Sequence, residues 1–331
     1  KVYNPIMTGS HISTLTFTGL TRQYNNLREE ILEVTDQVLS TGQHMLGTYT
    51  KHFEDWLSKK NGQPTLTVHN GTQALEIVAE WYKKTYNGTV YLPAFSFIAT
   101  DNAFKRVGCN IKYVDVDEYG LMVDAEAEEW TDLVVLVGLY GAAVKPQKGI
   151  ICEDGAQNWT GNNFKRVGDI CTMSFDPMKN LPSYGNGGAI CTQIPELYEF
   201  VRNFRHHHHP KYTDVATNSK MSELDCAYML VKSKHIEEWD ARRKDIARYW
   251  MSDCKHKVLI KDINTHALQK FVIQLDDRDD FRDKVCYPTR INYPYTLAPT
   301  DNAVKLSKTV VSVPIYPELT DAEVEIIHDS L

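Results

Sequence analysis

The stretch SFDPMKNLPSYGNGGAI, residues 174–190, links two segments of strand-like composition and holds one lysine between them. The flanking segments, 170–175 and 189–192, are rich in residues that suit a half-buried sheet. Pro177 and Pro182 restrict the backbone on either side of Lys179. The pattern predicts two strands joined by a short loop that fixes the amine of Lys179 at a strand end.

A fixed lysine has two interpretations. Most lysines are solvated surface groups. A lysine removed from water has a lowered pKa, and its amine becomes a nucleophile toward carbonyl carbons. The choice between a surface lysine and a nucleophile therefore depends on the residues around Lys179.

A pair of acids follows the buried strand expected just upstream. The segment GIICED, residues 149–154, ends in Glu153 and Asp154, and strand alternation points these two side chains to opposite faces. Ligands of open α/β sheets bind outside the carboxyl ends of the strands. Pyridoxal phosphate requires a Schiff-base lysine and an acid against its pyridine nitrogen, which Lys179 and Asp154 would supply. A turn or helix-capping role is the alternative for Asp154.

A candidate phosphate site lies near residue 70. The strand expected at 65–68 runs into His69-Asn70-Gly71-Thr72, and an apolar-periodic helix follows. Free backbone N–H groups at a helix start, Gly71 for close approach and the Thr72 hydroxyl together suit an anion. A plain turn and helix cap is the competing interpretation.

In their order along the chain and in their residues, these segments resemble the DegT/StrS-type sugar aminotransferases, a branch of the fold-type I pyridoxal-phosphate enzymes. The resemblance runs from about Val38 to the C-terminus. It implies an α/β fold with a large domain, whose mostly parallel sheet is sandwiched by helices, and a smaller C-terminal α+β domain. We place the large domain at 1–222 and the small domain at 223–331. The matching segments are 69–75, 93–100, 113–117, 153–157, 174–179, 185–190, 218–224 and 314–320.

The resemblance also implies the roles of individual residues. Lys179 and Asp154 are the catalytic pair. Phe97 lies against the face of the pyridoxal ring, although a buried core phenylalanine is a rival interpretation. Asn218 reaches the cofactor phosphate of a neighbouring subunit, which implies a homodimer with shared sites. The other expected cofactor contacts are Gly71, Thr72, Gln157 and Ser174.

Two positions depart from the family pattern. Asn186 stands where the family commonly has an acid, so no charge is assigned there. Lys220 stands where the family usually has an arginine, and lysine lacks the planar fork for a bidentate contact. The run His206-His207-His208-His209 is interpreted as a solvated loop, because four consecutive side chains cannot all face one ion in regular structure. No metal site is predicted.

The function implied by the resemblance is transfer of an amino group from glutamate to a nucleotide-linked keto-sugar through a Schiff base on Lys179. A sugar dehydratase of the same family is one alternative, but those relatives carry histidine at the Schiff-base position. Another pyridoxal enzyme, such as an aldolase or desulfurase, could share the Asp154–Lys179 pair. A non-enzymatic cofactor-binding protein is the third alternative.

Composition excludes several other classes. The 331 residues are 42% hydrophobic and 24% charged, which is ordinary for a globular protein. A net charge of −7 offers no basic footprint for nucleic acid. No apolar run reaches membrane-spanning length, no signal-peptide pattern is present, and seven scattered cysteines form no close pairs. We therefore expect a cytoplasmic protein with reduced thiols.

The order of strands and helices supports the same fold. Alternation predicts a largely parallel sheet, and no strand leads into a G-x-G-x-x-G turn, which disfavours a nicotinamide enzyme. Residues 1–21 are expected to form an arm or a short strand region. Helices are expected at 22–39, 50–60, 221–250 and 321–331, and strands at 65–68, 90–92, 111–116, 133–137, 150–152, 170–175, 189–192, 258–260 and 271–275.

Overall fold

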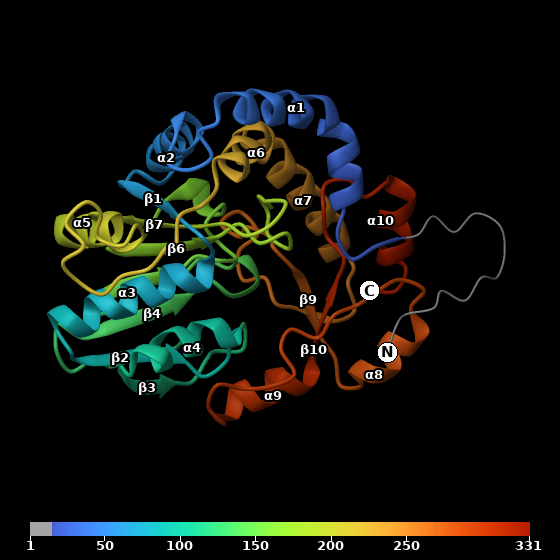
Figure 1. Cartoon of the computed structure of the whole chain (residues 1–331). Helices are drawn as coiled ribbons and strands as arrows, with labels where there is room; N and C mark the ends of the chain where they lie inside the picture. Colours follow the sequence, from blue (N-terminus) through green and yellow to red (C-terminus); the bar gives the residue numbers. More distant parts are fainter. Residues whose placement is uncertain (1–14) are drawn as a thin grey trace.

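The computed structural model describes residues 15–331, and its centre is a seven-stranded sheet (Figure 1). The spatial order is β1-β7-β6-β5-β4-β2-β3. Only β7 runs antiparallel to its neighbours, so the predicted mostly parallel sheet is confirmed. The strands are β1 (Thr65–Val68), β2 (Thr89–Pro93), β3 (Asn110–Val114), β4 (Leu133–Val137), β5 (Ile150–Asp154), β6 (Ile170–Ser174) and β7 (Gly188–Thr192).

Helices cover both faces of this sheet (Figure 1). One face shares a core with three helices that follow β1, β2 and β7 in the chain. The other face packs against the two N-terminal helices and α6. Burial on both faces explains why β4, β5 and β6 are nearly continuous runs of buried residues. The helices are α3 (Gly71–Thr85), α4 (Ile98–Val107) and α5 (Pro195–Phe204) on the first face, and α1 (Leu20–Thr41), α2 (Thr48–Asn61) and α6 (Glu223–Ser233) on the second.

The prediction of a single long helix over 221–250 is wrong. The structure has two helices there, α6 and α7 (Ile236–Met251). The last turn of α6 tightens, because the Lys234 N–H donates to the Val231 carbonyl and the His235 N–H to the Lys232 carbonyl. The new helix then starts with the Trp239 N–H donating to the His235 carbonyl. No glycine or proline marks this break in the sequence.

A smaller unit at the C-terminus has its own core. Three antiparallel strands in the order β10-β9-β8 pack with the end of α7 and with α10. The sequence predicted β8, β9 and the closing helix but missed β10, α8 and α9. The domain boundary at 222/223 stays a prediction. The elements are β8 (Lys257–Val258), β9 (Phe271–Gln274), α8 (Arg278–Lys284), α9 (Asp301–Thr309), β10 (Val310–Val313) and α10 (Asp321–His328).

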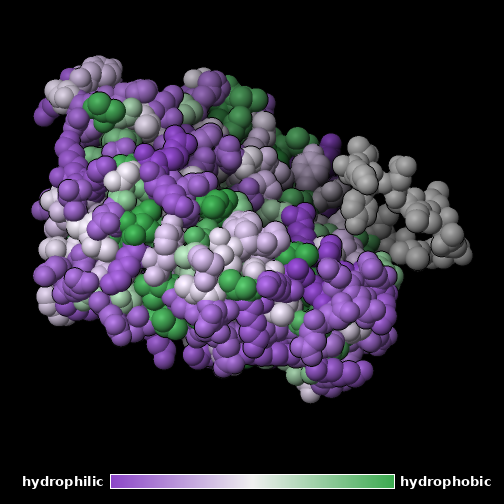
Figure 2. All heavy atoms as spheres, turned by 90° about the horizontal axis from the view of Figure 1, so that it is seen from below, coloured by the Kyte–Doolittle hydropathy of each residue, from purple (hydrophilic) through white to green (hydrophobic). Residues whose placement is uncertain are grey.

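The remaining expectations concern the surface and the N-terminus. The predicted arm at 1–21 lies mostly outside the described residues, and the chain is helical from Leu20. Across residues 15–331, no helix is both long enough and apolar enough to cross a membrane. Figure 2 shows one face of the molecule, where hydrophilic residues predominate and hydrophobic ones form small separate patches.

Candidate active site

A pocket of about 440 Å³ lies at the carboxyl ends of the parallel strands. Its position is where open α/β sheets bind ligands, and its volume is typical of small-molecule sites. Residues far apart in the chain meet there, from the start of α3 to the loop between α8 and α9. Seven of the eight predicted site residues line it, namely Gly71, Thr72, Phe97, Asp154, Gln157, Ser174 and Lys179.

Lys179 is held in the predicted loop by bonds to its neighbours. The Asp176 carboxylate accepts from the Met178 N–H (2.9 Å), and the Asp176 carbonyl accepts from the Lys179 N–H (2.9 Å). From the small unit, the Gln269 amide donates to the Met178 carbonyl (2.7 Å). The Lys179 amine itself has no hydrogen-bond partner among the described residues. The backbone is therefore fixed while the amine is free to react.

The electrostatics of Lys179 favour a reactive amine. Desolvation lowers the pKa of Lys179, while the charges of Asp154 and Asp176 oppose that shift. A lowered pKa increases the fraction of neutral amine near neutral pH. The structure thus supports the nucleophile interpretation over the solvated one.

Asp154 is buried at the end of β5 and faces the pocket. Its Oδ2 accepts from the Thr100 hydroxyl (2.7 Å), and its Oδ1 accepts from the Ala156 N–H (3.2 Å). Burial raises the pKa of Asp154, and these bonds and Lys179 oppose the rise. Glu153 points away and accepts from the backbone N–H groups of Val167 and Gly168, as alternation predicted.

The start of α3 leaves two donors for an anion. The Asn70 side chain caps the Gln73 N–H (2.8 Å), which leaves the N–H groups of Gly71 and Thr72 without partners among the described residues. A Cβ on Gly71 would lie 2.8 Å from the Ser174 Cβ, so only glycine allows this approach of α3 to β6. Backbone N–H groups, the helix dipole and two hydroxyls therefore converge at one end of the pocket.

An open aromatic ring lies between the anion end and the small unit. Phe97 is 48% exposed, so the core-phenylalanine interpretation is wrong. Its centroid is 5.5 Å from that of Tyr293, at a 38° interplanar angle. The Gln157 amide accepts from the Tyr140 N–H (2.9 Å) and donates to the Tyr293 hydroxyl (3.3 Å). These contacts orient Gln157 toward the pocket, and its role toward a cofactor oxygen stays a prediction.

This set of groups fits pyridoxal phosphate. Unpaired N–H groups suit a phosphate, an exposed phenyl ring suits a flat heteroaromatic ring, and a buried carboxylate suits a ring nitrogen. The free amine of Lys179 suits an aldehyde carbon. The residues that line one pocket therefore fit the phosphate, the ring and the aldehyde of this cofactor.

Sequence reasoning missed several pocket residues. Thr100 was within the matched segment 93–100, one helical turn after Phe97, so its position could have been noticed. Lys270, Arg290 and Tyr293 come from the C-terminal unit and line the same pocket. No local motif in the sequence connected these three residues to Lys179.

Asn218 lies outside this pocket, on the exposed segment that follows the histidine run. Lys220 donates to the Asn218 Oδ1 (2.5 Å) and lies 2.8 Å from the His206 Nδ1. The Asn218 amide nitrogen has no partner among the described residues. Its contact with a second subunit stays a prediction.

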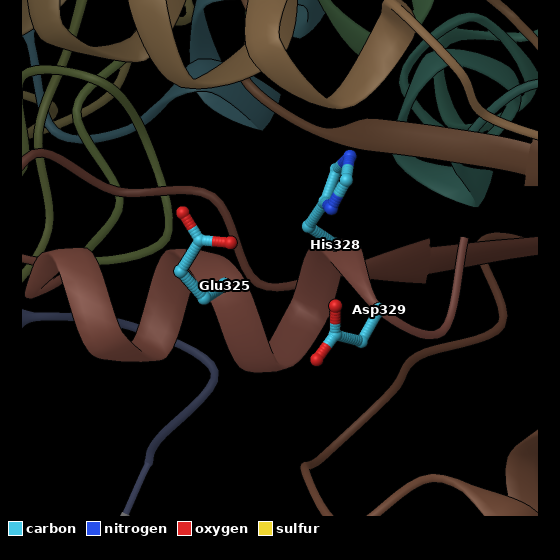
Figure 3. A group of neighbouring side chains, drawn as sticks. All are labelled: Glu325, His328 and Asp329. Carbon is cyan, nitrogen blue, oxygen red and sulfur yellow. The ribbon is translucent and has the colours of Figure 1, made fainter.

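Metal-ligand spacing occurs in one group of the described residues, Glu325, His328 and Asp329 at the end of α10 (Figure 3). Other side chains already bind two of the three. The His328 Nε2 lies 2.7 Å from the Asp253 carboxylate, and the Tyr249 hydroxyl donates to Glu325 (2.8 Å). The run 206–209 belongs to no such group and forms turns with two exposed histidines.

Comparison with known proteins gives a consistent result. A model of the DegT/DnrJ/EryC1/StrS aminotransferase family matches residues 25–331. A "Pleiotropic regulatory protein" of Geobacillus stearothermophilus is 28% identical, over 94% of this chain and 96% of that protein. UDP-2-acetamido-2-deoxy-3-oxo-D-glucuronate aminotransferase of Pseudomonas aeruginosa is also 28% identical, over 94% and 98%.

Solved structures share the fold. S. venezuelae DesV, determined in complex with a ketimine intermediate, has a TM-score of 0.89 at 23% identity, over 96% of this chain and 98% of that chain. NtdA from Bacillus subtilis with bound cofactor PMP has a TM-score of 0.84 at 24% identity, over 98% and 86%. The predicted α/β fold with a smaller C-terminal unit is thereby confirmed.

Proposed function

The chain belongs to the DegT/DnrJ/EryC1/StrS aminotransferase family, and from that premise we propose the reaction that it catalyses. It is a pyridoxal-phosphate-dependent sugar aminotransferase that moves an amino group from glutamate to a nucleotide-linked keto-sugar. The observation that carries this proposal is the meeting of the free Lys179 amine, buried Asp154 and the open start of α3 in one pocket.

The cofactor site follows from the donors. The N–H groups of Gly71 and Thr72, with the Ser174 hydroxyl, would hold the phosphate. Phe97 would stack on the ring face, and Gln157 would bind the ring oxygen. Bound in this way, pyridoxal phosphate supplies an electron sink for the negative charge that forms when the donor α-carbon loses its proton.

The protein groups divide the remaining work. Asp154 would lie beside the ring nitrogen and would keep that nitrogen protonated, while the Thr100 hydroxyl and the Ala156 N–H support its carboxylate form. The Lys179 amine would take up and return the proton of the donor α-carbon, because its lowered pKa leaves it able to accept a proton near neutral pH. In the second half-reaction the keto-sugar would receive the amino group and leave as an amino-sugar, with Lys179 moving the proton in the opposite direction.

We also propose a homodimer with shared sites. Its support is that Asn218 is exposed, lies outside its own pocket and keeps a free amide nitrogen. Mixing an inactive Lys179→Ala protein with an inactive Asn218→Ala protein should restore activity, because one site of each hybrid keeps both residues. Absence of any restoration in confirmed hybrids would contradict shared sites.

Nitrogen transfer is the direct test of the function. The protein, pyridoxal phosphate and glutamate labelled at nitrogen are incubated with a panel of nucleotide-linked keto-sugars, and products are analysed by mass spectrometry. We expect labelled nitrogen in an amino-sugar and stoichiometric 2-oxoglutarate. Loss of oxygen from the sugar without gained nitrogen would indicate a dehydratase. Cofactor binding without turnover of any sugar would indicate a regulatory protein, as the name of the Geobacillus relative suggests.

A further inference from the structure

Two cations face the candidate active site from the C-terminal unit. Lys270 lies immediately before β9, and Arg290 pairs with Ser312 of β10 through two backbone hydrogen bonds (3.0 and 2.8 Å). Both residues line the 440 Å³ pocket that contains Lys179 and Asp154. Because β9 and β10 pair in one sheet, a single rigid element carries both cations.

Lys270 is buried without a counter-ion. The residue is only 7% exposed, and its Nζ makes one hydrogen bond, to the neutral Gln269 Oε1 (2.8 Å). The described residues offer it no ion pair. Burying an ammonium group without a carboxylate partner is costly, so this arrangement leaves an unmet demand for negative charge.

Arg290 adds a second unpaired charge. The guanidinium carbon lies 4.8 Å from the centroid of the Phe17 ring, which supports its position. No described carboxylate pairs with this side chain. A guanidinium fork beside an ammonium group is a donor set that suits a carboxylate.

The expected cofactor does not satisfy these cations. Its phosphate belongs at the N-terminus of α3, where Gly71, Thr72 and Ser174 converge, and those residues come from the large unit. Asp176 also lines the pocket, but its Oδ1 already accepts from the Met178 N–H. The unmet charge therefore faces the space left for a substrate.

We propose that Lys270 and Arg290 form a carboxylate subsite of the active site and determine specificity for an acidic substrate. The inference rests on the proposed function and deepens it. The carboxylate has two possible sources, the amino donor or an acidic keto-sugar, and the chemistry that recognises it is the same for both.

The protonation state of Lys270 gives the subsite a pH signature. Burial, together with the charges of Lys179 and Arg290, lowers the pKa of Lys270 to about 7, and the charge of Asp176 opposes this shift. Arg243 and Glu318 line a second, smaller cavity that Lys270 also lines. A bound carboxylate favours the charged form, so binding takes up protons near neutral pH and weakens as the pH rises above about 7.

The test combines equilibrium binding with half-reactions. Glutarate, which has two carboxylates and no amine, is titrated calorimetrically into the cofactor-loaded protein in buffers of different ionisation enthalpy. If the subsite binds the carboxylate of the amino donor, Lys270→Met and Arg290→Gln should each weaken glutarate binding by about tenfold or more, and Lys270→Met should abolish the proton uptake. Lys270→Arg should retain part of the affinity, and exposed Lys305→Met on α9 should behave as wild type.

Substrate comparisons distinguish the two sources. If the carboxylate belongs to the donor, Lys270→Met raises the KM for glutamate and leaves the acceptor half-reaction unchanged. If it belongs to the acceptor, glutarate binding stays at the wild-type level, and the KM rises only for keto-sugars that carry a uronic acid. Both results support the subsite.

Two results would overturn the inference. One is unchanged affinity for every carboxylate in both charge-removing variants. The other is a Lys270→Met protein in which only the pH titration of the cofactor band shifts, because Lys270 would then act on Lys179 and not on substrate. Loss of the cofactor band in the wild type would instead defeat the proposed function, so the two failures are distinguishable.

Discussion

Thr100 offers a direct probe of the buried acid. It is 1% exposed, and its hydroxyl donates to the Asp154 Oδ2 at 2.7 Å. The Ser96 hydroxyl lies 3.2 Å from the same oxygen of Thr100. Thr100→Val keeps the shape of the side chain but removes this hydroxyl, so one oxygen of a buried carboxylate loses its donor.

The magnitude follows from the kind of bond that is lost. A hydrogen bond to a charged group contributes about 1.5–3 kcal/mol, and about 1.4 kcal/mol corresponds to a factor of ten in affinity. We therefore expect Thr100→Val to bind pyridoxal phosphate about 10- to 100-fold more weakly. The pKa of Asp154, which burial already raises, should rise further, so the loss should grow as the pH falls.

Fluorescence or absorbance titration with pyridoxal phosphate at several pH values measures this change. Thr100→Ser is the matched control, because it keeps the hydroxyl and should bind within a few-fold of the wild type. Thermal unfolding of the cofactor-free proteins separates a folding defect from a binding defect. Wild-type affinity and pH dependence in Thr100→Val would refute the argument that this bond keeps Asp154 ionised.

Further predictions concern the phosphate end and the stability of the fold. Gly71→Ala should bind pyridoxal phosphate far more weakly, because the added Cβ would lie 2.8 Å from the Ser174 Cβ; wild-type affinity would exclude a tight cradle. The hydrogen bond from Arg22 lowers the pKa of Glu323 from 4.5 to about 2. Its stabilising effect should be fully present above pH 4.5 and be lost as the pH falls toward 2, whereas Glu323→Gln should lack this part of the pH dependence of unfolding. If the free energy of unfolding of the wild type and of Glu323→Gln changed with pH in the same way between pH 4.5 and 2, the assignment would be contradicted.

The large unit was predictable because its signals are local. Short apolar segments, each followed by polar residues or glycine, gave the parallel strands and brought Asp154, Ser174 and Lys179 to one edge of the sheet. Strand alternation also separated Asp154 from Glu153 correctly. These patterns depend on neighbours in the chain, so a sequence displays them.

The other side of the pocket was not predictable in this way. Lys270 is 91 residues from Lys179, and only the packing of the C-terminal unit brings them together. The break between α6 and α7 has the same origin. Packing of α6 on α1 and α2, and of Trp250 in the C-terminal core, sets the change of direction, while the sequence at 233–236 contains no helix breaker.

The central claim is that Lys179 binds the cofactor covalently and that glutamate releases it. The decisive measurement is the visible spectrum of the protein with pyridoxal phosphate, before and after glutamate, followed by borohydride reduction and peptide mass spectrometry. We predict an absorbance band that requires Lys179, a reduced adduct on the peptide that contains it, and conversion by glutamate to the spectrum of the aminated cofactor with release of 2-oxoglutarate. An unchanged band in Lys179→Ala, or an adduct mapped to Lys270, would contradict the account.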